Sequence, residues 1–71
     1  MSLLYKAAIS HYEAKRDEAR ATLEVYFNKP VGVGEHSDLL EEIRKWAETL
    51  AMAEDTLERL RANFTEEGQV K

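Results

Sequence analysis

The chain has 71 residues, of which 44% are hydrophobic and 34% are charged, with no cysteine and a net charge of −4. This length allows one small domain, and the composition excludes both a disordered chain and a membrane protein. The lack of cysteine excludes disulfides and thiolate-bound metals, and the negative charge opposes binding to nucleic acids or anionic membranes.

The first residues, Met1 to Lys6, do not resemble a secretory signal. They contain no basic region followed by a sustained apolar run, and a charge arrives early. No segment approaches the roughly 18 apolar residues of a membrane span. We therefore expect a cytoplasmic protein.

A first helix is predicted over about residues 2–28. Ser2 can cap it, and neither Gly nor Pro interrupts it. Pro30 ends it, because the proline ring disfavours a helical conformation at Lys29. Apolar residues recur every three or four positions and form one face. This face consists of Tyr5, Ala8, Ile9, Tyr12, Ala19, Leu23 and Tyr26.

Residues 29–37 are predicted to form the loop. Gly32 and Gly34 permit positive φ angles there. A Gly-x-Gly before a helix also occurs in phosphate-binding loops. Here no Gly-Lys-Ser/Thr follows and no strand precedes, while Glu35 and Asp38 would repel a phosphate. We interpret the segment as a turn between helices.

A second helix is predicted over about residues 38–64. Asp38 and Glu41 have the spacing of a capping box. Two series of residues recur every seven positions, a heptad pattern that predicts a long helix packing along one stripe. The first series is Leu39, Trp46, Ala53 and Leu60, and the second is Ile43, Leu50, Leu57 and Phe64. Residues 65–71 are polar and are predicted to fray.

Two long helices and a short loop predict an all-α fold, an antiparallel hairpin that forms a single domain over residues 1–71. If the loop is tight, Ala19 lies opposite Trp46, Tyr12 lies opposite Ala53, and Arg16 lies near Glu48 and Thr49.

One seam between two helices cannot offset the conformational entropy of roughly 60 ordered residues, about 90 kcal/mol. We therefore predict that two copies associate into a four-helix bundle, a homodimer with two-fold symmetry. The residues expected in the core or the self-association interface are Tyr12, Leu23, Tyr26, Ile43, Trp46, Leu50, Leu57, Leu60 and Phe64.

Several acidic residues are of the types that bind metal ions. Glu35, His36, Asp38, Glu41 and Glu42 lie close together in the sequence. Acidic residues at the start of a helix are explained by capping and by the helix dipole. We expect no metal site here.

A second acidic set, Glu54, Asp55 and Glu58, together with Glu41 and Glu42 superficially resembles the magnesium-binding carboxylates of helical nucleoside-triphosphate hydrolases. The first helix lacks a matching set. His11 has no Ser or Cys nucleophile as a partner. We expect no catalytic residue and no cofactor.

The favoured interpretation is a non-enzymatic protein-interaction or accessory protein that acts as a self-associated hairpin. Two alternatives stay open. One is a nucleic-acid-associated module that uses Lys15, Arg16, Arg20 and Lys29 on the basic side of the first helix. The other is a metal-dependent hydrolase.

The loop segment Asn-Lys-Pro-Val-Gly-Val-Gly-Glu-His-Ser-Asp, residues 28–38, is followed by Leu-Leu-Glu-Glu-Ile and later by Ala53-Glu54-Asp55-x-Leu57. This combination resembles small helical proteins encoded by T4-type bacteriophages. The resemblance implies expression in an infected bacterial cell, hence the host cytoplasm, and a small accessory role, but no activity. The topology also resembles the plasmid copy-control hairpin dimers that bind RNA, although the acidic second helix opposes RNA binding.

Overall fold

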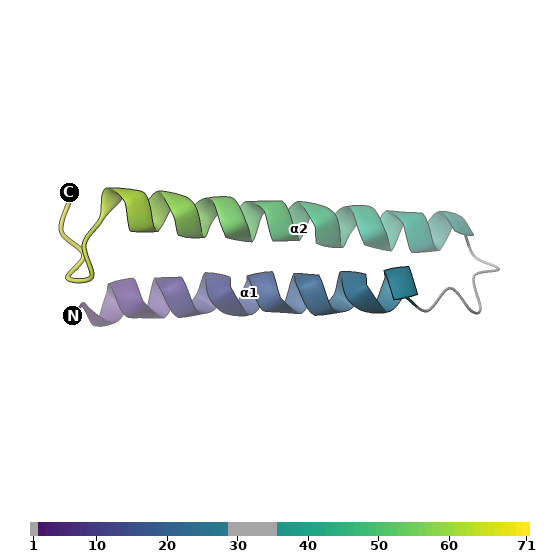
Figure 1. The fold of residues 1–71 in the computed structure, drawn as a ribbon, viewed down its shortest axis with the longest axis horizontal. Coiled ribbons are helices and arrows are strands. Elements are labelled where there is room, and N and C mark those ends of the chain that lie inside the picture. The colour runs from purple at the N-terminus through teal and green to yellow at the C-terminus, as the bar shows by residue number, and fades with distance from the viewer. Residues whose placement is uncertain (1, 29–35) are drawn as a thin grey trace.

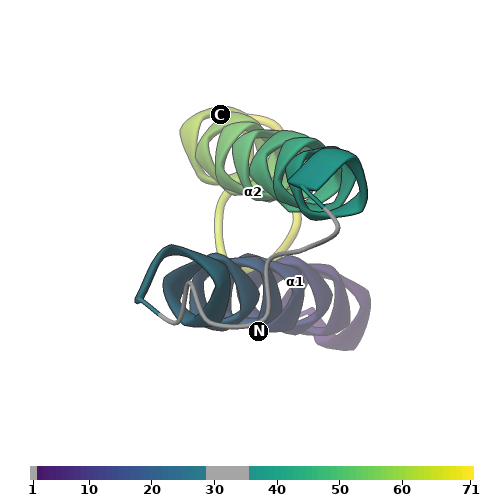
Figure 2. The same ribbon diagram turned by 90° about the vertical axis from the view of Figure 1, so that its right-hand side faces the viewer.

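The computed structural model describes residues 2–28 and 36–71, and for His36 and Ser37 it describes the backbone only. Two helices, α1 (Leu3–Asn28) and α2 (His36–Asn63), run antiparallel and side by side (Figures 1 and 2). The fold is the all-α hairpin that the sequence predicts. The predicted loop over residues 29–37 lies largely outside the described residues.

The hairpin is a rod with principal extents of 50 × 14 × 14 Å and a radius of gyration of 15.8 Å. A compact domain of this length would have a radius of gyration of about 11 Å. The elongated shape follows from two helices of 26 and 28 residues, which no third helix or strand of residues 2–28 and 36–71 covers. Most side chains therefore remain near the surface.

The core is a thin seam between the helices. Four hydrophobic residues are buried in the described part of the chain: Ala19, Leu23, Ala53 and Leu57. The remaining members of the two predicted stripes are all half-buried. Small alanines alternate with leucines at this centre, which lets two helices pack closely without voids.

The start of α1 is capped as predicted. The Ser2 hydroxyl accepts a hydrogen bond from the backbone N–H of Tyr5 at 3.2 Å. This bond satisfies one of the amides that a helix leaves without an intrahelical partner. The start of α2 differs from the prediction, because the helix begins at His36. Asp38 therefore lies inside the first turn, where it favours the helix dipole, and does not cap the helix.

The prediction that residues 65–71 fray is wrong. Residues 64–71, here called the terminal turn, fold back so that Phe64 and Val70 form an antiparallel bridge. The Thr65 N–H donates to the Gln69 carbonyl at 2.8 Å, and the Lys71 N–H donates to the Asn63 carbonyl at 2.9 Å. These bonds satisfy backbone groups that a frayed end would leave to water.

The terminal turn also joins the two ends of the chain. The Ser2 N–H donates to the Glu66 carbonyl at 3.1 Å. Gly68 makes the reversal possible with a φ of +80°, a conformation in which side-chain-bearing residues are strained. Figure 2 shows this turn in yellow, passing from α2 towards α1.

The predicted register is wrong. Glu13 pairs with Arg61, so Ala19 does not lie opposite Trp46 and Tyr12 does not lie opposite Ala53. Arg16 shares a surface hollow with Glu54, Leu57 and Glu58, about two helical turns beyond the predicted neighbours Glu48 and Thr49. The prediction assumed that both helices end level at the loop. In the structure α2 extends past the end of α1 there (Figure 1), while the terminal turn holds the other ends together.

Candidate functional site

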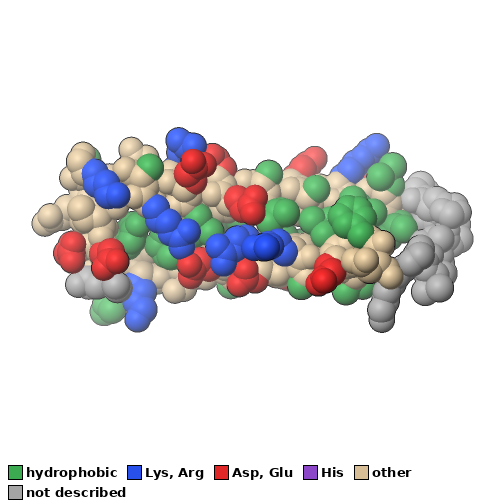
Figure 3. All heavy atoms as spheres, in the orientation of Figure 1, with side chains coloured by type: hydrophobic (Ala, Val, Ile, Leu, Met, Phe, Trp, Pro, Cys, Tyr) green, Lys and Arg blue, Asp and Glu red, His purple; other side chains and the backbone are tan. Residues whose placement is uncertain are grey.

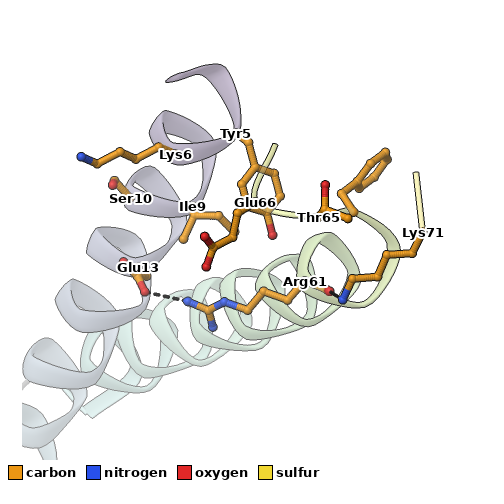
Figure 4. A pocket seen from close by; sticks show the side chains of 10 residues that line it. Tyr5, Lys6, Ile9, Ser10, Glu13, Arg61, Thr65, Glu66 and Lys71 are labelled. Carbon is orange, nitrogen blue, oxygen red and sulfur yellow. Dashed lines mark hydrogen bonds and ion pairs between the residues drawn. The ribbon is translucent and has the colours of Figure 1, made fainter. Parts of the chain in front are cut away.

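One hollow lies at the end of the hairpin where the two ends of the chain meet. It has a volume of about 620 Å³ and is lined by α1, the last turn of α2 and the terminal turn (Figure 4). Its walls combine the apolar side chains Tyr5, Ile9 and Phe64 with polar and charged ones. The polar and charged lining residues are Lys6, Ser10, Glu13, Arg61, Thr65, Glu66 and Lys71.

The Arg61 and Lys71 side chains in this hollow each form a hydrogen bond to another part of the chain. The Arg61 guanidinium donates to the Glu13 carboxylate at 2.6 Å, the ion pair that links the two helices. The Lys71 ammonium donates to the Arg61 carbonyl at 2.7 Å. Figure 4 shows Arg61 reaching across to Glu13 and Lys71 turning back to α2. These bonds therefore link α1 to α2 and the terminal turn to α2.

The lining of this hollow contains no Ser–His or Cys–His pair of the kind used in acyl transfer. Among its ten residues the only hydroxyl-bearing aliphatic side chains are Ser10 and Thr65, and no histidine or cysteine accompanies them. Acyl transfer by a serine needs a base within hydrogen-bond reach. His11, the candidate that the sequence raises, is exposed and packs edge-on against Tyr12 with ring centroids 4.9 Å apart.

A second hollow, of about 440 Å³, lies along the seam between the helices. Charged residues of both signs line it: Arg16 and Arg20 from α1, and Glu54, Glu58 and Arg61 from α2, with Leu57 at its base. Figure 3 shows Lys and Arg side chains gathered where the helices meet, with acidic side chains beside them. Because the charges nearly balance, this surface lacks the excess positive charge that phosphate backbones require.

Two of the basic residues proposed for nucleic-acid binding, Arg16 and Arg20, line the second hollow together. Lys15 and Arg16 are neighbours in sequence and so point about 100° apart around the helix. Lys15 lies 3.7 Å from Glu18, and Arg16 lies 3.0 Å from Asp17. Lys29 lies outside the described residues. Lys15 and Arg16 therefore each have an acidic neighbour on α1, which lowers the positive charge that a phosphate backbone would meet.

The acidic residues considered for metal binding are in part outside the described residues and in part paired with an arginine. Glu35 and the side chain of His36 are outside the described residues, and Asp38 and Glu41 are exposed. Asp55 and Glu58 each lie 3.3 Å from Arg59. Within residues 2–28 and 38–71 the side chains bring no three potential ligands together around one point.

The predicted interface residues all lie in or beside the seam. Leu23 and Leu57 are buried, and none of the nine is exposed. Trp46 is half-buried, with the Lys45 ammonium 5.3 Å from its ring. The half-buried ones are Tyr12, Tyr26, Ile43, Trp46, Leu50, Leu60 and Phe64.

Sequence reasoning missed part of the exposed apolar surface. The sequence spacing does place five apolar residues off the seam, and all five are exposed: Leu4, Phe27, Leu40, Ala47 and Ala51. Four further large hydrophobic residues are exposed as well: Leu3, Val25, Met52 and Val70. The available signal was a second apolar stripe on the first helix, on the side away from the seam.

Comparison with family models, with curated proteins and with solved structures finds no match to this chain. The resemblance of residues 28–38 to T4-type phage proteins therefore stays a prediction. In the described part of the chain, neither helix is both long and apolar enough to cross a bilayer.

Proposed function

We propose that this chain is a non-enzymatic protein-interaction module that works as a self-associated helical hairpin, most simply a homodimer of four helices. The observation that carries the proposal is the imbalance between core and surface. Among the described residues four hydrophobic side chains are buried, whereas seven large ones are about half exposed or more. Burial of apolar surface is the main favourable term in folding, so a lone hairpin with this core is marginal.

The exposed area supports the same proposal. The chain exposes 5309 Å², whereas a compact monomer of 8.2 kDa would expose about 4,500 Å². The excess of about 800 Å² equals the share of one partner in an interface of standard size. A second copy would remove this excess and enlarge the core.

The resemblance of the loop to T4-type phage proteins extends the proposal. It suggests an accessory role in the cytoplasm of an infected bacterium. The first hollow is lined by no Ser–His or Cys–His pair, and the described residues hold no cluster of three potential metal ligands; both observations favour a binding role over an enzymatic one.

Sedimentation equilibrium tests the proposal. The chain should sediment as a dimer at roughly 50 µM, a concentration well above the dissociation constant expected of a standard interface. A species with the mass of one chain that remains fully helical at this concentration would overturn the proposal. Circular dichroism on the same samples supplies the helix content.

A further inference from the structure

The side of α1 that faces away from α2 carries an unpartnered apolar stripe. This stripe, here called the outer face of α1, consists of Leu3, Ala7, Ala14, Ala21 and Val25, all exposed. Ala21 lies two residues from each of the buried Ala19 and Leu23, so its side chain points about 160° from both and directly away from the seam. Leu3 is 80% exposed and Val25 is 53% exposed, so large apolar side chains stand at both ends of the stripe.

The corresponding side of α2 is charged. Arg44, Glu48, Asp55 and Arg59 are exposed there, and Arg59 is paired with Asp55 at 3.3 Å. The helices also differ in net charge. α1 has four basic and four acidic residues, whereas α2 has four basic and seven acidic ones. Two α1 helices can therefore approach without net repulsion, which two α2 helices cannot.

We infer that a second copy of this chain docks on the outer face of α1, with the two α1 helices antiparallel and the two-fold axis at Ala14. This inference rests on the proposed self-association and names the surface that performs it. The interface is isologous, so the same residues meet from both copies. Both α1 helices then lie at the centre and both α2 helices lie outside.

The stripe is complementary to itself in this arrangement. Ala7 lies opposite Ala21 of the second copy, and Leu3 lies opposite Val25 of the second copy. Alanines at intervals of seven residues keep the middle of the contact thin, so that the helix axes can approach closely. The larger Leu3 and Val25 close each end of the contact. The five apolar residues meet their counterparts over about 33 Å of helix, with Ser10 and Asp17 exposed between them.

The polar residues beside the stripe favour the antiparallel orientation. It places His11 beside Glu18 of the second copy and Ser10 beside Asp17 of the second copy, because residues on the same flank of the stripe meet across the two-fold axis. Both pairs join an N–H or O–H donor to a carboxylate acceptor. A parallel pair would instead place Asp17 and Glu18 beside their own counterparts, where like charges repel.

Matched substitutions test the surface. Ala14→Glu places two carboxylates at the proposed axis, whereas Ala51→Glu adds the same charge at an exposed position of α2. Both residues are exposed and glutamate is a good helix former, so each variant should keep the hairpin. Overpacking and repulsion should raise the dimer dissociation constant of Ala14→Glu by about 10- to 100-fold, and that of Ala51→Glu by less than about threefold.

Cross-linking tests the orientation in the intact dimer, even if Ala14→Glu fails to fold. The chain has no cysteine, so each introduced one is unique. A disulfide needs Cα atoms within about 7 Å. A mixture of Ala7→Cys and Ala21→Cys chains should oxidise mainly to the mixed dimer, and Ala14→Cys should cross-link with itself.

The remaining outcomes distinguish a failure of self-association from a wrong docking surface and from a wrong helix orientation. A helical monomer for the unsubstituted chain would overturn both the proposed function and this inference. An unsubstituted dimer that Ala14→Glu and Ala51→Glu weaken equally would overturn the docking surface and leave self-association standing. Preferential cross-linking of Ala7→Cys with itself would overturn the antiparallel orientation.

Discussion

Leu57 is the residue on which the seam depends most. It is 2% exposed and is the largest fully buried side chain of the described residues. The substitution Leu57→Ala removes three carbon atoms from this position, which costs about 2.4 kcal/mol at 0.8 kcal/mol per buried methylene. Because Leu57 borders the second hollow, water can reach part of the space that it leaves. The cavity term is therefore small, and we expect a loss of about 2–3 kcal/mol, near the lower end of the usual range.

Leu40→Ala is the matched control for this substitution. Leu40 lies in the same helix but is 49% exposed. The same three carbon atoms are only half removed from water there, so the expected cost is about 1 kcal/mol. Urea unfolding followed by circular dichroism measures both costs. All samples must have one protein concentration, because self-association couples apparent stability to concentration. Equal losses for the two variants would refute the seam described here.

Three further perturbations probe the ends of the hairpin. The Glu13–Arg61 pair is about half exposed despite its 2.6 Å length. A double-mutant cycle of Glu13→Gln and Arg61→Gln should therefore give a coupling free energy below about 1 kcal/mol, which falls with added salt. A larger, salt-insensitive coupling would contradict this. Gly68→Ala forces alanine to a φ of +80° and brings its Cβ within 3.4 Å of the Ser2 Cβ. This conformation costs about 1–2 kcal/mol, so hydrogen exchange at the Thr65 amide should become at least about fivefold faster. Unchanged exchange would show that the terminal turn tolerates alanine. Ser2→Ala should cost about 1 kcal/mol in urea unfolding and Ser2→Asp almost nothing, because aspartate also caps helices; equal losses would argue against the cap.

The sequence predicts the two helices and their seam because local periodicity determines both. The seven-residue spacing from Leu39 to Phe64 identifies the face of α2 that carries the buried Ala53 and Leu57. The same reasoning identifies Ser2 as the cap of α1, since a cap bonds only to residues three positions away. Such features require no knowledge of the partner helix.

The terminal turn could not be predicted in this way. Residues 65–71 are polar and contain Gly68, a composition typical of a frayed end. Their order depends on the backbone of Ser2, which lies more than sixty positions away in sequence and next to them in the fold. Single-sequence patterns do not report contacts of this range. The position of Arg16 beside Glu54 was missed for a related reason, because the terminal turn helps to set the register.

The outer face of α1 illustrates a different difficulty. Ala7, Ala14 and Ala21 have the same spacing as the heptads of α2, but alanine contributes little to a hydrophobic pattern. Only the structure shows that these residues lie opposite the seam and are accompanied by exposed Leu3 and Val25. The surface proposed for a second copy can be identified only after the residues of the seam between α1 and α2 are known.

The claim that the hairpin is completed by a second copy is tested most directly by thermal melting at two protein concentrations. A hundredfold increase, from roughly 2 µM to roughly 200 µM, adds about 2.7 kcal/mol of apparent stability to an obligate dimer. For a dimer of this size we expect the melting temperature to rise by about 5–10 °C. A melting temperature that stays constant across this range, with full helix content at the lower concentration, would contradict the claim.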